Sequence, residues 1–267
     1  MQRLTLLILL FFTTGKILSQ QNTASKQVST FSIEAPQLNC TKKIWIYLPK
    51  NYESTQKKYP VIYMHDAQNL FDAKTSFVGE WNVDEKLDSL NAQVIVVGIE
   101  HGNEKRMEEL TPYKNAKYGG GNADNYLNFI VKTLKPTIDT KYRTKTNARN
   151  TGIMGSSLGG LVSYYAILKY PEVFGKAGIF SPSFWFNRKE IMELTNTIPK
   201  LKTKIYFLCG DKEGDADMIT DLNKIDDLVS EKRCECMKLT RKKIVKGGQH
   251  NEKLWRDGFA KAYVWLF

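Results

Sequence analysis

A serine, a group of carboxylates and a histidine follow one another along this 267-residue chain in an order that suits nucleophilic catalysis. Ser157 lies at the centre of the pattern G-x-S-x-G, which reads Gly155-Ser156-Ser157-Leu158-Gly159. In a nucleophile elbow the chain turns so sharply from a strand into a helix that the residues two before and two after the serine must be small. The serine hydroxyl then stands at a helix N-terminus, where peptide N–H groups and the helix dipole favour developing negative charge. Ser157 is therefore a candidate nucleophile.

A serine hydroxyl is a poor nucleophile at neutral pH and needs an imidazole as its base. A carboxylate must hold the tautomer of that imidazole and stabilise its protonated form. The chain contains three histidines, His65, His101 and His250. In proteins that carry this elbow the serine comes first along the chain, then the acid, then the histidine. Only His250 follows Ser157, so the order selects His250 as the base.

The acid is expected on the loop after an apolar strand, Lys204–Cys209. That loop reads Gly210-Asp211-Lys212-Glu213-Gly214-Asp215. Asp211, Glu213 and Asp215 all compete for the role, and spacing alone does not choose among them.

The negative charge that develops on the substrate needs two N–H donors. One is expected from Leu158, and the other from the loop that follows an earlier central strand, at His65–Phe71. A metal site formed by His65, Asp66 and His101 is a rival interpretation of that loop. No ligand spacing such as H-x-x-H supports it, so we expect neither a metal nor another cofactor.

Strands and helices must alternate if they are to bring these residues together. A short apolar segment, Gly152–Met154, precedes the elbow, and a helix-forming segment, Leu161–Lys169, follows it. Apolar runs predict further strands at Lys43–Leu48, Pro60–His65, Val94–Ile99, Lys176–Ser181, Lys204–Cys209 and Arg241–Val245. Helices are expected at Glu80–Leu90, after a capping Asn122 and at Asn251–Phe267. The long polar segment His101–Gly121 is expected to be a loop that forms a wall or lid. Alternation of this kind predicts a mostly parallel α/β sandwich with helices on both faces of the sheet.

The N-terminus has the features of a secretory signal. Arg3 precedes an apolar run, Leu4–Phe12, that is too short to span a bilayer. We expect a signal peptide over residues 1–19, a disordered lead-in over residues 20–35 and a single domain over residues 36–267. The mature protein would be exported to the periplasm or the extracellular space, without stable membrane association.

The formal charge of the whole chain is +11, and removal of Arg3 and Lys16 with the signal leaves +9. The lysines are scattered and do not interleave with aromatic residues, so we expect no nucleic-acid partner, although the charge could aid encounter with acidic polymers. Of the four cysteines, Cys209 is predicted to be buried at the end of a strand. The redox state of Cys40, Cys209, Cys234 and Cys236 and the oligomeric state stay open.

Five ordered motifs together resemble those of the putative esterase family of α/β-hydrolases. They read H-D-A-Q-N-L-F-D at 65–72, G-S-S-L-G-G-L at 155–161, S-P-S-F-W-F at 181–186, G-D-K-E-G-D at 210–215 and G-G-Q-H-N-E-x-x-W at 247–255. The resemblance runs from about Lys43 to the end of the chain. The family includes siderophore, feruloyl and acetyl-xylan esterases and mycolyltransferases, so the resemblance implies the α/β-hydrolase fold and an esterase domain.

The resemblance also assigns roles within the motifs. It makes Ser157 the nucleophile, His250 the base and Glu213 the acid, while the N–H of Gln68 becomes the second oxyanion donor. Asp66 and Trp185 would contact the substrate, although Trp185 could equally be a buried core aromatic. One position departs from the pattern, because relatives usually have glycine where Ala67 stands, which puts the approach of substrate to that loop in doubt.

These observations predict a secreted serine carboxylic-ester hydrolase that works through an acyl-enzyme. Its substrate would be an acylated carbohydrate, a siderophore or a similar ester, either small or linked to a polysaccharide. Two alternatives remain open. The first is an acyltransferase of the same fold, and the second is a non-catalytic carbohydrate-binding relative.

Overall fold

The computed structural model describes residues 22–232 and 239–267. The expected signal peptide at residues 1–19, and Cys234 and Cys236, lie outside the described residues. Of the helices in the described part of the chain, none combines the length and the apolarity that a membrane span requires.

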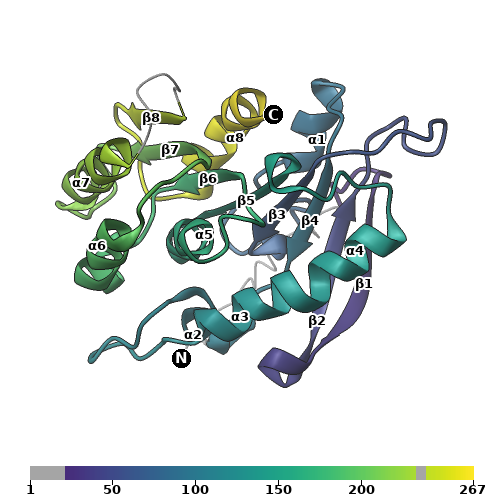
Figure 1. The fold of residues 1–267 in the computed structure, drawn as a ribbon. Helices are drawn as coiled ribbons and strands as arrows, with labels where there is room; N and C mark the ends of the chain where they lie inside the picture. The colour runs from purple at the N-terminus through teal and green to yellow at the C-terminus, as the bar shows by residue number, and fades with distance from the viewer. Residues whose placement is uncertain (1–21, 233–238) are drawn as a thin grey trace, which may run out of the picture.

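Eight strands form one sheet, in the order β1-β2-β4-β3-β5-β6-β7-β8 (Figure 1). β2 pairs antiparallel with both β1 and β4, and all the other neighbours pair in parallel. The expected mostly parallel sheet is therefore confirmed. The strands are β1 (Val28–Ala35), β2 (Cys40–Tyr47), β3 (Val61–His65), β4 (Ile95–Ile99), β5 (Thr151–Ser156), β6 (Lys176–Phe180), β7 (Lys204–Gly210) and β8 (Thr240–Val245).

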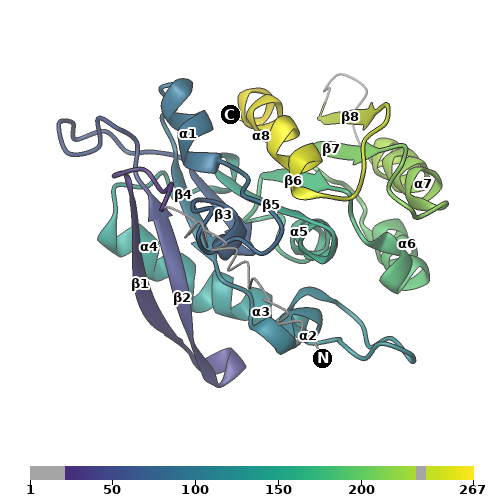
Figure 2. The same cartoon turned by 180° about the vertical axis from the view of Figure 1, so that it is seen from behind.

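Helices cover both faces of the sheet (Figures 1 and 2). On one face α1 (Val83–Ser89) and α8 (Glu252–Leu266) contribute Leu87 and Phe259 to one apolar core. On the other face a second core includes Leu127, Leu161 and Ile225. The helices on that second face are α2 (Arg106–Leu110), α3 (Ala123–Phe129), α4 (Lys135–Lys141), α5 (Leu158–Lys169), α6 (Arg188–Thr197) and α7 (Met218–Glu231).

The N-terminal strand differs from the sequence expectation. Residues 28–35 form β1, whereas we expected residues 20–35 to be a disordered lead-in. β1 pairs with β2 along its whole length, and its Phe31 and Ile33 pack partly buried on the core. The segment is polar, so its sequence shows no strand signal. It forms a strand because its backbone pairs with β2, and local sequence does not indicate such pairing.

The segment His101–Gly121 is also more ordered than expected. It contains the 3-10 helix η3 (Asn103–Lys105) and helix α2, whose last residue, Leu110, is buried. Asn122 stands at the N-cap of α3 as expected, but its side chain makes no capping hydrogen bond. Part of this segment is therefore helical and packs on the core through Leu110.

His65 is a core residue that joins three elements. It ends β3, its Nδ1 lies 2.7 Å from the hydroxyl of Tyr126 on α3, and its Nε2 lies 3.1 Å from Oγ of Ser163 on α5. Burial lowers the pKa of His65 from 6.5 to about 4. The imidazole is therefore neutral at physiological pH and serves packing and hydrogen bonding.

This lowered pKa predicts a pH-dependent stability. As the pH falls below about 6.5, the unfolded chain binds a proton at His65 before the folded chain does, so stability that is present above pH 6.5 is lost toward pH 4. Between pH 7.5 and pH 4.5 the wild-type chain should lose about 2 kcal/mol more free energy of unfolding than a His65→Gln variant. Chemical denaturation of both proteins at several pH values measures the difference. Parallel pH profiles would contradict the prediction.

Candidate active site

Ser157 occupies a strained turn between β5 and α5. Its backbone has φ 56° and ψ −121°, a region that residues other than glycine rarely adopt. A Cβ on Gly155 would lie 2.8 Å from the carbonyl carbon and oxygen of Gly159, so only glycine fits. The strand, the sharp turn and the helix that G-x-S-x-G requires are all present.

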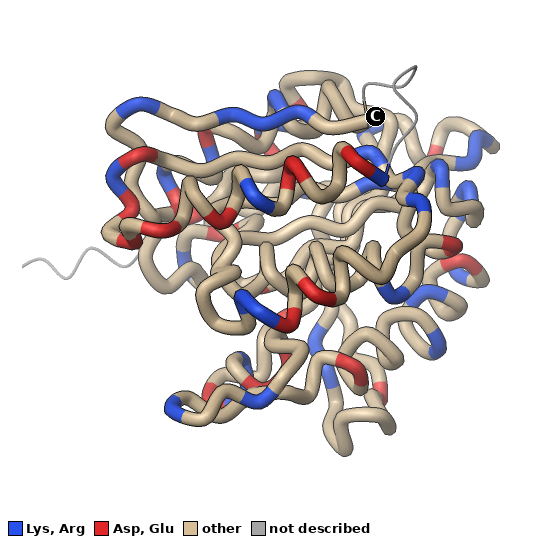
Figure 3. Tube along the Cα trace, turned by 60° about the vertical axis from the view of Figure 1, so that its left-hand side comes forward, with Lys and Arg blue, Asp and Glu red and all other residues tan. Residues whose placement is uncertain are grey.

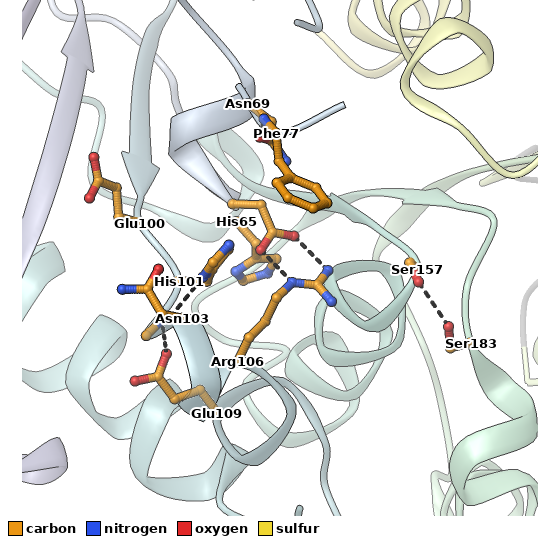
Figure 4. A network of polar contacts seen from close by, with 12 residues as sticks. His65, Asn69, Phe77, Glu100, His101, Asn103, Arg106, Glu109, Ser157 and Ser183 are labelled. Atoms are coloured by element: carbon orange, nitrogen blue, oxygen red, sulfur yellow. Dashed lines mark hydrogen bonds and ion pairs between the residues drawn. The ribbon is translucent and has the colours of Figure 1, made fainter. Parts of the chain in front are cut away.

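The residues that follow β6 hold this turn in place. The N–H of Ser157 donates to the carbonyl oxygen of Phe180 at 3.0 Å, and the N–H of Ser183 donates to the carbonyl oxygen of Ser157 at 3.0 Å. The hydroxyl of Ser157 also lies 3.1 Å from the hydroxyl of the buried Ser183 (Figure 4). The backbone N–H and the carbonyl oxygen of Ser157 thus both form hydrogen bonds with residues 180–183.

The structure brings His250 and Glu213 together from separate loops. His250 lies between β8 and α8, just before Asn251, whose side chain accepts the N–H of Leu254 and so caps α8. Nδ1 of His250 lies 3.0 Å from Oε2 of Glu213, whose side chain is only 1% exposed. Because β5, β7 and β8 are parallel, Ser157, Glu213 and His250 all follow strand ends at the same edge of the sheet.

The other oxygen of Glu213 is held by a chain of donors. Trp255 donates its indole N–H to Oγ of Ser181 at 2.8 Å, and Ser181 donates its hydroxyl proton to Oε1 of Glu213 at 2.6 Å. The N–H of Gly210 donates to the same carboxylate oxygen. The Trp255 ring also packs edge-on against the His250 ring, with centroids 5.1 Å apart. Glu213 and His250 are therefore both oriented by neighbours that are themselves fixed.

The two rival carboxylates point elsewhere. Oδ1 of Asp211 accepts the N–H of Gly247 at 2.6 Å, and Oδ1 of Asp215 accepts the N–H of Asp217 at 2.9 Å. Of the three acids on this loop, Glu213 is the one in contact with His250.

The two expected oxyanion donors both belong to first turns of helices. Leu158 is the first residue of α5, and Gln68 lies in the 3-10 helix η2 (Ala67–Asn69) that follows β3. N–H groups at these positions have no acceptor within their own helix, so they can receive an anionic oxygen. The methyl group of Ala67 is fully buried and packs on Gly98 of β4.

Asp66, which we expected to contact the substrate, forms an ion pair with Arg106. Both of its carboxylate oxygens bind Arg106, at 2.7 Å to Nε and 2.9 Å to Nη2 (Figure 4). Burial alone would raise the pKa of Asp66, but the guanidinium outweighs that effect and holds the pKa below its usual value. Asp66 therefore fixes the guanidinium of Arg106, and its contact with the substrate stays a prediction. Sequence analysis missed Arg106, since no spacing links positions 66 and 106.

Trp185 is a surface aromatic and not a core one. Its side chain is 41% exposed, and its ring contacts Tyr118 at a centroid distance of 5.6 Å and Phe186 at 5.5 Å. Tyr118 comes from the 101–121 segment and is also exposed. The two rings form an aromatic wall two residues beyond Ser183, which itself bonds Ser157.

The residues of the rival metal site already have protein partners. His65 is bonded as described, Asp66 binds Arg106, and Nδ1 of His101 accepts the N–H of Asn103 at 2.9 Å. Within the described residues, one group of acids is close enough to share a cation, and it consists of Glu80, Asp84 and Glu85. Oxygens of Glu80 and Asp84 accept hydrogen bonds from Thr23 and Ser25.

Several site residues were not singled out from the sequence. Ser181 and Ser183 stood within the S-P-S-F-W-F motif, and Trp255 within the last motif, but their roles as hydrogen-bond partners depend on contacts across the fold. Glu252, two residues after His250, is buried, and burial raises its pKa.

Comparison with known proteins places the chain in a family. The family described as "Putative esterase" matches residues 35–266. The uncharacterized protein YbbA of Bacillus subtilis is 28% identical over 239 residues, which cover 85% of this chain and 92% of YbbA. The ferri-bacillibactin esterase BesA of the same organism is 29% identical over 161 residues, 55% of each chain.

A solved structure supports the fold. The crystal structure of the BES protein from Bacillus cereus superposes with a TM-score of 0.72 at 19% sequence identity, over 94% of this chain and 99% of that one. The match to the family begins at the last residue of β1 and spans β2 to β8. The chain therefore belongs to the putative esterase family and is a carboxylic-ester hydrolase of the α/β-hydrolase type.

Proposed function

We propose that the protein is a serine esterase in which Ser157 is the nucleophile, His250 the base and Glu213 the acid. The observation that carries the proposal is the 3.0 Å contact between His250 and Glu213, at the sheet edge where the strained Ser157 also stands. The tight glycine contact at the elbow and the fixed orientation of Glu213 support the same roles.

The reaction would begin with the hydroxyl of Ser157 turning from Ser183 toward Nε2 of His250. His250 takes the hydroxyl proton while Oγ attacks the ester carbonyl, and Glu213 stabilises the imidazolium through Nδ1–H. The N–H groups of Leu158 and Gln68 bind the oxyanion of the tetrahedral intermediate. His250 then protonates the leaving alcohol, which departs and leaves an acyl group on Ser157.

Water completes the cycle. His250 removes a proton from the water as its oxygen attacks the acyl carbonyl, and returns that proton to Oγ of Ser157 when the acid leaves. The burial of Glu213 keeps its oxygen on Nδ1 throughout. Two protons are taken up and two are returned, so His250 ends in its starting state.

The substrate we propose is an acylated carbohydrate, a siderophore or a similar ester. The exposed rings of Trp185 and Tyr118 would pack on a sugar or aromatic ring near the ester. The relative named as a ferri-bacillibactin esterase supports an ester of biological origin. The apolar run near the N-terminus supports export to the periplasm or the extracellular space, with residues 1–19 as the signal.

The first prediction concerns the nucleophile. Replacement of Ser157 by Ala removes the attacking oxygen, so kcat for a nitrophenyl acetate should fall at least a thousandfold, in line with other serine hydrolases. Ser156→Ala makes the same change one residue earlier, on β5, and should retain activity. A fluorophosphonate probe should label the wild-type protein and Ser156→Ala but not Ser157→Ala. Hydrolysis by Ser157→Ala at the wild-type rate would show that Ser157 is not the nucleophile.

A second prediction ranks the carboxylates. Glu213→Gln keeps the shape of the side chain but loses the charge that holds the His250 tautomer, so kcat should fall by about a hundredfold or more. Asp211→Asn and Asp215→Asn alter acids that contact backbone N–H groups instead, and each should cost less than about tenfold. Steady-state kinetics of the three variants test the order. A larger loss for either Asp variant would move the acid role to that residue.

A third prediction concerns the positioning residue Ser181. Ser181→Ala removes a donor from Glu213 and the acceptor of the Trp255 indole, so kcat should fall about tenfold with KM little changed, since one hydrogen bond to a charged group is worth about 1.5 kcal/mol. Trp255→Phe breaks the same chain of bonds one step further away. If the bonds act in series, the double variant should lose little more than Ser181→Ala alone. Fully additive losses would show that the two residues act separately.

A further inference from the structure

A groove of about 700 Å³ lies between the edge strand β8 and the helix α8. Tyr206 and Leu208 of β7, both buried, line its floor. Gly247, Gly248, Gln249 and Asn251, which flank His250 in the loop between β8 and α8, line one end. Neither Ser157 nor His250 lines the groove. It therefore begins behind the proposed base and extends along α8.

Basic side chains surround this groove on three sides. Arg241 and Lys243 alternate along β8, Lys246 follows that strand, and Lys253 and Lys261 stand two helical turns apart on α8. All five are exposed. Figure 3 shows β8 as a long blue stretch along the upper edge of the molecule.

Side chains alternate between the two faces of the sheet along β8, so Lys242 points away from Arg241 and Lys243. The side chain of Lys242 points to the other face of the sheet, where its Nζ lies 2.9 Å from Asp226 and 2.8 Å from Asn223 on α7. Arg241 and Lys243 therefore face the α8 side, and the Arg241 guanidinium lies 5.9 Å from the ring of Trp265.

Among the described residues, most of this positive charge has no counterion. Asp257 is the one acid among the described lining residues, and it pairs with Lys253 at 2.7 Å. Within residues 22–232 and 239–267, Arg241, Lys243, Lys246 and Lys261 form no ion pair with a carboxylate. Four cations without an ion-pair partner among the described residues create a positive potential around the groove that attracts an anionic ligand.

The surface of the groove narrows the class of ligand. Single-stranded nucleic acid binds where bases can stack on exposed aromatic faces, and the one aromatic residue among the described lining of this groove, Tyr206, is 3% exposed. A membrane-binding surface would require large exposed apolar side chains. None of those in the described part of the chain lines the groove. Flexible lysines spaced along a strand and a helix suit carboxylates spaced along a saccharide chain.

We propose that the groove between β8 and α8 binds a carboxylated oligosaccharide, so that the preferred ester stands on an acidic polysaccharide whose chain passes the His250 loop toward Ser157. Binding of the acidic chain follows from the groove itself. Only the delivery of its ester to Ser157 rests on the proposed function.

Binding of an unesterified oligogalacturonate to the wild-type protein tests the groove without any catalysis. By calorimetry at low salt, Lys243→Glu/Lys261→Glu should bind it at least tenfold more weakly than the wild-type protein. Lys57→Glu/Lys58→Glu makes the same charge change at two exposed lysines before β3 and should bind within about threefold of wild type. A neutral xylo-oligosaccharide should not bind, and raised salt should weaken oligogalacturonate binding because exposed charges are screened.

Three outcomes would overturn the proposal. They are no binding by the wild-type protein, equal losses in the two double variants, and tighter binding of a sulfated oligosaccharide or a single-stranded RNA with the same dependence on Lys243 and Lys261.

Kinetics separate the groove from the proposed function. On nitrophenyl acetate both double variants should match the wild-type protein, because neither pair is in the catalytic machinery. On an acetylated oligogalacturonate, Lys243→Glu/Lys261→Glu should raise KM about tenfold with kcat unchanged. If the wild-type protein binds the acid chain but hydrolyses neither ester, the proposed function fails and the binding groove stands. If it hydrolyses both esters and the groove variant has an unchanged KM, the delivery of substrate through the groove is wrong.

Discussion

The short segment from Phe180 to Ser183 is the constraint on which the candidate site depends. Phe180 and Ser183 bond the two peptide groups of Ser157, whose positive φ would otherwise relax. Ser181, between them, donates to Glu213 and accepts from Trp255. One turn of chain at the end of β6 therefore holds Ser157, the proposed nucleophile, on one side and Glu213, the proposed acid, on the other, so a shift in this segment would disturb both.

Burial divides the ionisable groups around the site into those that hold structure and those free to react. His65 is neutral and bonded on both nitrogens within the core. Asp66 is charged, because Arg106 compensates for its burial. His250, in contrast, is bonded on Nδ1 by Glu213 while its ring is 30% exposed. The histidine selected by chain order is thus partly exposed, whereas His65 is buried.

Much of the fold could be predicted from the sequence, because buried parallel strands are apolar over their whole length. Val94–Ile99 and Lys204–Cys209 were recognised for this reason and agree with β4 and β7 within one residue. β1 was not recognised, since an edge strand with a polar outer face has little local signal. Arg106 escaped notice for a related reason, because its carboxylate partner lies forty residues away on another element.

The sequence by itself determined the elbow, the histidine proposed as base and the set of three candidate acids, because the strained turn demands glycines and the order expected of a triad follows the order of the strands. Only the tertiary structure decided that Glu213 is the carboxylate in contact with His250, that Asp66 pairs with Arg106, and that Trp185 lies on the surface. Those outcomes depend on side-chain directions set by loops after different strands. Those directions are fixed by hydrogen bonds between distant segments, such as the one from Ser181 to Glu213. Such bonds leave no pattern in the local sequence from which they could be predicted.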